Sequence, residues 1–220
     1  MKAILKLITV MSSVSLILVA TQGQAKQREQ TTEASFIIGF NDSFTIDGQQ
    51  GSSVDFDSDY SIGFNIIYNY SSQFAVEFDW LTGRQDYLSN LVDDEGEVVD
   101  TVDHTASITH AQLHGTYYFS PENFSFYLQG GAGFSYIDSN IISGPPINIC
   151  WWDPWFGYIC EGFSATYSKS EFSYSASVGA RYNLDNTTFI RASYSQIWVD
   201  LDHAKTSDMS VYKFEIGRSF

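Results

Sequence analysis

Apolar and polar residues alternate along most of this chain, with a period of two rather than the period of 3.6 that a helix requires. Between Tyr60 and Tyr70 every even-numbered position is apolar or aromatic, and the odd positions are polar or small except Ile67. A strand points successive side chains to opposite faces, so each such segment has one apolar and one polar face. The alternation predicts eight strands, at about 34–40, 60–70, 74–80, 110–119, 124–136, 172–182, 190–198 and 212–220.

The links between these strands alternate between short and long. The short ones, 71–73, 120–123 and 185–187, are rich in turn residues, and the long ones are about 41–59, 83–105, 137–168 and 199–209. Short turns at one end and long loops at the other are typical of a transmembrane β-barrel, whose tilted strands need ~9–11 residues to cross the bilayer. A soluble secreted barrel or sandwich is the alternative, but it hides its apolar face inside and has no reason to keep its long loops at one end. We therefore predict an all-β fold, an eight-stranded antiparallel up-and-down transmembrane β-barrel.

The first 25 residues have the features of a secretory signal peptide. Lys2 and Lys6 form a positive segment, 7–20 is mostly apolar, and Gly23 and Ala25 are the small residues that a signal peptidase reads. A membrane anchor is the alternative, but the apolar stretch is shorter than the ~20 residues that a spanning helix needs. We expect a signal peptide over 1–25, a short periplasmic segment over 26–33 and the barrel over 34–220, with both mature termini in the periplasm.

Composition excludes two classes of protein. The chain has 26 acidic and 11 basic residues, a net charge of -15, and its aromatic content is 16%. A disordered chain has few aromatic residues, and a nucleic-acid binder needs a basic surface. We expect an ordered chain with no nucleic-acid partner.

Three segments, 126–134, 174–182 and 214–220, carry a resemblance to a known family. The chain resembles the small eight-stranded outer-membrane β-barrels, the porin-like barrel domain related to the transmembrane domain of outer membrane protein A. The resemblance implies a Gram-negative outer membrane, contact with its lipid and lipopolysaccharide, and a C-terminal Phe220 that serves as the signal for the barrel-assembly machinery. We expect a monomer. The family does not imply one function, because the same barrel serves as anchor, adhesin, channel and enzyme.

The polar face of the strands faces the barrel interior, which eight strands leave just wide enough for side chains to fill. We predict an interior polar network of Glu77, Asp79, His114, Tyr127, Gln129, Arg181, Arg191, Lys213 and Glu215. Its three acids and three bases balance, which favours paired charges because an unpaired buried charge is costly. Counting residues from the expected periplasmic turns places Glu77, Tyr127, Arg181 and Arg191 at similar depth, in one layer. The network is interpreted as a plug that holds the barrel closed; a gated narrow pore is the alternative.

Metal and catalytic chemistry have weak support. His110 and His114 share a face, but four strand residues place them ~13 Å apart, too far to bind one ion. Lipid A deacylases of similar size carry a His with a Ser two positions later. Here the residues two positions after the four histidines are Ala106, Gln112, Thr116 and Lys205. We expect no catalytic residues, no metal and no cofactor.

The third long loop holds the only cysteines, Cys150 and Cys160, and an exported chain meets an oxidising compartment, so a disulfide between them is expected. This pair would frame an extracellular contact loop with five aromatic residues: Trp151, Trp152, Trp155, Phe156 and Tyr158. The aromatic residues either pack on each other and on neighbouring loops or meet a surface ligand. Most of the acidic residues fall in the long loops, where they provide solvation and repulsion or hold divalent cations.

These observations favour a non-enzymatic surface or structural protein that acts in membrane integrity or in adhesion through its loops. The alternatives are a narrow porin-like channel for small solutes or ions and, third, a lipid-modifying barrel enzyme.

Overall fold

The computed structural model describes residues 28–47, 53–92, 98–143, 147–155, 157–200 and 207–220. The regular elements in these residues are all β-strands. No helix in the described part of the chain is long and apolar enough to cross a membrane. The expected signal peptide, 1–25, lies outside the described residues, so its cleavage stays a prediction.

Eight long strands form a closed ring, in which each strand pairs antiparallel with the strand before it and the strand after it. The ring strands are β1 (Thr31–Asn41), β4 (Asp59–Asn69), β5 (Phe74–Val92), β6 (Val98–Tyr118), β7 (Phe124–Ile142), β10 (Thr166–Asn183), β11 (Thr188–Val199) and β12 (Ser207–Ser219). The last strand returns to the first, from the pair Glu33–Ser219 to the pair Asn41–Val211. The predicted fold class, an eight-stranded antiparallel up-and-down β-barrel, is therefore confirmed.

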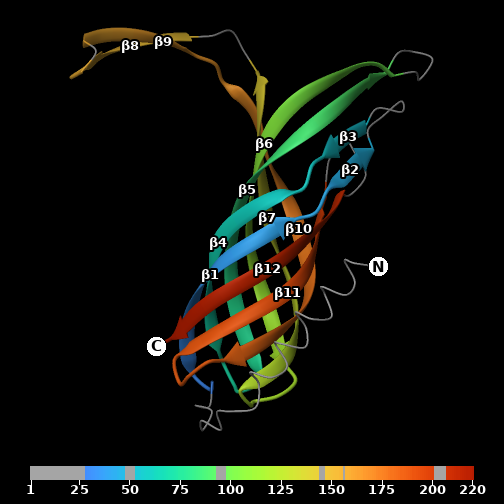
Figure 1. Cartoon of the computed structure of the whole chain (residues 1–220), viewed down its shortest axis with the longest axis vertical. Coiled ribbons are helices and arrows are strands. Elements are labelled where there is room, and N and C mark those ends of the chain that lie inside the picture. The colour runs from blue at the N-terminus through green and yellow to red at the C-terminus, as the bar shows by residue number, and fades with distance from the viewer. Residues whose placement is uncertain (1–27, 48–52, 93–97, 144–146, 156, 201–206) are drawn as a thin grey trace, which may run out of the picture.

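The two ends of the barrel differ as predicted from the links. The tight turns β4–β5, β6–β7 and β10–β11 lie at one end, here called the turn end, together with the start of β1 and the end of β12. The long connections lie at the opposite, loop end (Figure 1). The first strand begins at Thr31, earlier than the expected Ala34, so the last residues of the expected periplasmic segment belong to the barrel.

Alternation along the ring strands turns apolar side chains outward. On β1, Phe36, Ile38 and Phe40 are exposed, whereas Ile37 and Gly39 between them are buried. An apolar side chain on the outer face would be costly in water, but it lies at no cost against the hydrocarbon of a bilayer. The barrel therefore has the outer surface of a membrane protein.

The long links contain strands that were not predicted. The link β1–β4 holds a hairpin of β2 (Phe44–Asp47) and β3 (Ser53–Phe56), which extends the sheet beside β5. A second hairpin, β8 (Ile147–Asp153) and β9 (Gly157–Phe163), forms a two-stranded sheet of its own. It projects away from the ring at the top of Figure 1, where β5 and β6 also rise beyond their neighbours.

The interior is divided along the barrel axis. The turn-end half holds the charge pairs together with a small apolar and aromatic cluster, whereas the loop-end half holds a larger apolar cluster. This loop-end apolar cluster comprises Ile37, Phe56, Leu81, Tyr87, Ala106, Ile108, Ile197, Val199, Met209 and Val211. Phe56 belongs to β3, and its ring centroid lies 4.8 Å from that of Tyr87, so the β2–β3 hairpin contributes to the packing of the barrel mouth. Alternation along the strands predicts a polar inner face, so this apolar cluster differs from the prediction.

Candidate functional site

The structure places all nine residues of the predicted interior network inside the ring, and all nine are buried. They come from neighbouring strands: Glu77 and Asp79 from β5, His114 from β6, Tyr127 and Gln129 from β7, Arg181 from β10, Arg191 from β11, and Lys213 and Glu215 from β12. Period-two alternation is sufficient to point them inward, because each lies an even number of residues from its inward neighbours on the same strand.

Arg191 reaches across the interior and joins two acids from different strands. Its Nη1 donates to Glu77 Oε2 at 2.9 Å, and its Nε lies 3.7 Å from Glu215 Oε2. Glu77 also accepts hydrogen bonds from Thr116 Oγ1 at 2.7 Å and from Gln129 Nε2 at 2.9 Å. A buried carboxylate is tolerated only when several donors compensate for the lost water, and Glu77 has three.

Asp79 forms a second centre nearer the loop end. Lys213 Nζ donates to Asp79 Oδ2 at 3.0 Å, and His114 Nδ1 lies 3.5 Å from the same oxygen. His114 Nε2 shares a hydrogen bond with Ser175 Oγ at 2.8 Å. The centre therefore links β5, β6, β10 and β12 through one chain of polar contacts.

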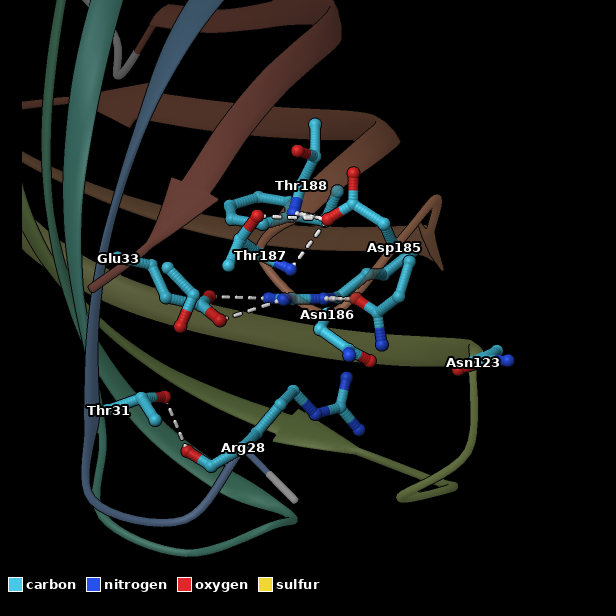
Figure 2. Close-up of a pocket in the computed structure, with 12 residues that line it drawn as sticks. Arg28, Thr31, Glu33, Asn123, Asp185, Asn186, Thr187 and Thr188 are labelled. Carbon is cyan, nitrogen blue, oxygen red and sulfur yellow. Dashed lines mark hydrogen bonds and ion pairs between the residues drawn. The ribbon is translucent and has the colours of Figure 1, made fainter. Parts of the chain in front are cut away.

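Arg181 pairs with an acid that the predicted network did not include. It was predicted to lie in one layer with Glu77 and Arg191, but its Nη1 and Nη2 donate to the two oxygens of Glu33 at 2.6 and 2.8 Å. Figure 2 shows the Glu33 carboxylate facing this guanidinium at the turn end. Glu33 was missed because the first strand was expected to begin at Ala34; the alternation of Glu33, Ser35 and Ile37 was the signal that could have found it.

Two further donors of the interior also lie on strands that contributed no predicted residue. Glu215 Oε2 accepts a bond from Ser35 Oγ on β1 at 3.0 Å and another from Asn65 Nδ2 on β4 at 2.7 Å. Both are short polar side chains at inward positions. Their role as donors to Glu215 could not be predicted from the sequence, because it depends on how close Glu215 lies in the folded barrel.

Tyr127 points into the interior from β7, beside Gly179 on the neighbouring strand β10. The Arg191 guanidinium lies over its ring at 4.4 Å, a cation–π contact. A Cβ atom added at Gly179, its partner in register, would come within 2.5 Å of the Tyr127 ring. Glycine at 179 is therefore what gives the tyrosine room.

Strands β10 and β11 also contribute small hydroxyl side chains to the interior. Ser173 and Ser175 on β10 take part in hydrogen bonds with Gln112, and Ser177 donates to Ser195 on β11 at 2.8 Å. At this level, long polar side chains such as Gln112 and His114 on β6 meet short serines on β10, which is how an eight-stranded interior accommodates both.

Ser175, His114 and Asp79 follow one another in the order of a hydrolase triad. However, Ser175 Oγ donates to Gln112 Oε1 at 3.0 Å, Asp79 is occupied by Lys213, and all three side chains are buried inside the ring. A nucleophile must reach a substrate atom, and this serine is enclosed by its own barrel. The arrangement of Ser175, His114 and Asp79 therefore fits a packed interior rather than a catalytic centre.

Histidines do not assemble a metal site in the described part of the chain. His110 Nδ1 shares a hydrogen bond with Ser135 Oγ at 2.7 Å, and both nitrogens of His114 face the contacts given above. Within the described residues, no group of three or more His, Cys, Asp or Glu side chains is arranged to hold a metal ion.

The predicted contact loop corresponds to the β8–β9 hairpin. Cys150 lies directly opposite Cys160 in register, the placement that their expected disulfide requires, and Trp152 lies opposite Tyr158. Trp152 is 68% exposed and Tyr158 72%, and Trp155 in the turn is exposed too. Phe156 and the side chain of Trp151 lie outside the described residues.

Phe220, the expected assembly signal, directly follows β12 at the turn end. Its amide donates to the Thr32 carbonyl at 2.9 Å, and its side chain is exposed.

Known structures of similar fold come from Gram-negative outer membranes. OprG from Pseudomonas aeruginosa has a TM-score of 0.52 at 15% identity, with 90% of this chain and 98% of that chain covered. Neisserial surface protein A has a TM-score of 0.52 at 9% identity, with coverages of 86% and 96%. Ail from Yersinia pestis, solved in complex with the heparin analogue sucrose octasulfate, has a TM-score of 0.46 at 20% identity, with coverages of 86% and 99%. These likenesses concern the fold alone.

No curated protein sequence matches the chain. The outer membrane protein beta-barrel domain family matches it over residues 11–220, which is nearly its whole length. The family agrees with the closed ring, the apolar outer face and the polar interior described above. The chain belongs to the outer membrane protein beta-barrel domain family and is an outer-membrane protein.

Proposed function

We propose that this protein is a closed outer-membrane barrel that anchors surface loops, with a structural or adhesive role and no enzymatic activity. The observation that carries the proposal is the bridging of the interior by charge pairs between different strands. Arg181 on β10 binds Glu33 on β1, Arg191 on β11 binds Glu77 on β5, and Lys213 on β12 binds Asp79 on β5.

These pairs oppose the passage of solutes. Opening a path would separate buried charges, and breaking one buried pair costs about 3–5 kcal/mol because the remaining charge is left without compensation. Towards the loop end the same path meets the loop-end apolar cluster, in which the Tyr87 hydroxyl is the one side-chain polar group and is already bonded to Ser139 Oγ. A charged barrier and an apolar barrier therefore act in series.

The loop end offers the contact surface. The β8–β9 hairpin pairs with no strand of the ring, and two-stranded hairpins are marginally stable unless something further holds them. The expected Cys150–Cys160 disulfide would supply that constraint. The exposed pair of Trp152 and Tyr158 is the kind of aromatic surface that protein interfaces favour.

A narrow channel is the competing function, favoured by the small serines along β10 and β11. Single-channel conductance of the refolded protein in a planar bilayer separates the two functions, with folding checked by the gel shift of the barrel on heating. We expect a folded protein that gives no conductance steps. Discrete steps from the wild-type barrel would overturn the closed-barrel proposal and assign the charge pairs to a gate.

The adhesive role is tested with the aromatic pair of the hairpin. Cells that produce the double variant Trp152→Ser, Tyr158→Ser would be compared with wild-type cells for sedimentation and for sensitivity to detergent. If the role is structural, cells that lack the whole protein should become sensitive to detergent, whereas cells with the double variant should not. If the role is adhesive, cells with the double variant should adhere to one another less and therefore sediment more slowly than wild-type cells. Cells lacking the protein that behave as wild type in both assays would contradict both roles.

A further inference from the structure

A small polar pocket lies at the turn end, between the start of β1 and the β10–β11 turn (Figure 2). Its volume is about 20 Å³, which is room for one water-sized group. Besides Arg181 and Glu33, its lining includes Arg28 and the amide side chains of Asn123 and Asn186. Of these residues, only Arg181 belongs to the interior network predicted from the sequence. The closed-barrel proposal gives Arg28 no role.

Arg28 is held in this pocket by the backbone of two different turns. Its Nη2 donates to the carbonyl oxygens of Ser72 and Ser120 at 3.2 and 2.5 Å, and its guanidinium lies over the Tyr118 ring at 4.2 Å. The side chain is only 4% exposed. Its Nε and Nη1 are buried and have no hydrogen-bond partner within the described residues.

In the described part of the chain the charge of Arg28 is only partly offset, by the Glu33 carboxylate, which lies near it but forms no ion pair with it. Glu33, the nearest buried acid of the pocket, already gives both oxygens to Arg181. No described carboxylate forms an ion pair with Arg28. The residues that precede it, 1–27, contain no Asp or Glu, so that stretch cannot supply the missing charge.

The surroundings make this excess of positive charge costly. Burial and the neighbouring Arg181 guanidinium together lower the pKa of Arg28 from its usual 12.5 to about 10. A buried cation with two free N–H groups beside a second cation is stabilised by an anion that can accept hydrogen bonds.

We propose that the turn-end pocket binds an oxyanion, the phosphate or carboxylate group of a periplasmic molecule, with Arg28 as its cationic ligand. One oxygen occupies the base of the pocket and accepts from Arg28, and the side-chain amide of Asn186 lies at the lining to donate to a second oxygen. Asp185 also lies at the rim, but its Oδ1 accepts bonds from the Thr187 and Thr188 amides of its own turn.

The test uses the refolded full barrel in an uncharged detergent at constant ionic strength. Sodium phosphate, sodium acetate and a soluble short-chain phosphatidic acid are titrated separately, and the readouts are the unfolding temperature and the NMR signal of the Asn186 side-chain amide. We expect at least one of the three to bind saturably, to raise the unfolding temperature and to shift the Asn186 amide signal. Saturation with the free ions assigns a soluble ligand, and saturation with the phosphatidic acid alone assigns a lipid headgroup.

Arg28→Gln removes the charge, and we expect it to weaken binding by at least about tenfold, since hydrogen bonds to charged groups contribute more than the free energy of a tenfold change. Arg28→Lys keeps the charge and serves if the Gln variant does not fold; we expect it to bind more tightly than Arg28→Gln and more weakly than wild type. Arg218→Gln, an exposed position on β12, is the matched control and should bind as wild type does. Absence of saturable binding to all three probes, or equal binding by wild type and both Arg28 variants, would overturn the proposal.

Discussion

At the scale of single residues, the interior depends on carboxylates that each serve several donors. Glu77 accepts from Arg191, Gln129 and Thr116, so its charge is shared among three strands. In such an arrangement the loss of one charge affects every partner, because the donors were placed for a charged acceptor.

We expect Glu77→Gln to destabilise the folded barrel by about 3–5 kcal/mol, the usual cost of breaking a buried ion pair. The new amide would direct N–H groups at Gln129 or Arg191, which are donors themselves, while Arg191 would keep only the Glu215 contact at 3.7 Å. Urea unfolding in lipid vesicles measures the change. Glu122→Gln, in the exposed β6–β7 turn, is the control and should change the free energy of unfolding by less than about 0.5 kcal/mol.

Two glycines on neighbouring strands make a second matched pair. A Cβ at Gly179 would meet the Tyr127 ring at 2.5 Å, whereas one at Gly130, on the outer face, would meet nothing closer than 3.9 Å. We expect Gly179→Ala to destabilise the barrel by about 1–3 kcal/mol through overpacking, and Gly130→Ala to be nearly neutral. Urea unfolding in lipid vesicles measures the free energy of unfolding of both variants. Equal effects of the two substitutions would contradict this packing of Tyr127 against Gly179.

At the scale of elements, the β10–β11 turn is organised by one carboxylate. Asp185 Oδ1 accepts from the Thr187 amide at 2.7 Å and from the Thr188 amide at 2.8 Å. These backbone bonds lower the pKa of Asp185 from 3.8 to about 2. Because the folded pKa lies below the unfolded one, the stabilisation is present above the unfolded pKa and is lost as the pH falls through the folded pKa.

Asp185→Asn should therefore be less stable than wild type at pH 7, and the difference should shrink as the pH falls from 4 to 2. The other acids titrate in both proteins and cancel in the comparison. Urea midpoints measured at several pH values provide the measurement. A difference that stays constant down to pH 2 would show that the charge of Asp185 does not hold the turn.

The elements also show where period-two alternation is informative. It located the eight ring strands, since a bilayer outside and a polar interior make the two faces of each strand chemically opposite. It did not find β2–β3 or β8–β9, because these strands lie beyond the bilayer and have no lipid-facing side. It also missed the loop-end apolar cluster, where Ile197, Trp198 and Val199 are consecutive apolar residues and the contrast between the faces is lost.

At the scale of the whole molecule, the inward positions could be predicted but not the pairs that they form. Arg181 and Arg191 lie opposite each other in register, yet each binds a different acid, Glu33 and Glu77. Strands in a barrel are tilted and staggered, so residues of equal depth by counting do not share a level across the interior. Partners across the interior therefore depend on the three-dimensional closure of the ring, which sequence spacing does not contain.

The two hairpins of the loop end differ in their attachment, and this leads to a prediction for the molecule as a whole. The β8–β9 hairpin pairs only with itself, and the Ser143 amide already donates to the Ala165 carbonyl at 2.8 Å beneath it. In contrast, the β2–β3 hairpin pairs with β5 and contributes Phe56 to the loop-end apolar cluster.

Replacing 144–164 by an Asn-Gly turn should leave a barrel that folds, shifts on heated gels and unfolds at nearly the wild-type urea concentration. Replacing 44–56 by the same turn should lower the free energy of unfolding by at least about 3 kcal/mol, since the removal of one buried phenylalanine has that effect. If instead the first deletion destabilised the barrel as much as the second, the β8–β9 hairpin would be part of the folding unit rather than a surface carried by it. The barrel and its contact loop would then not be separable, and the exposed aromatic pair, Trp152 and Tyr158, would belong to an element that stabilises the barrel rather than to an independent contact surface.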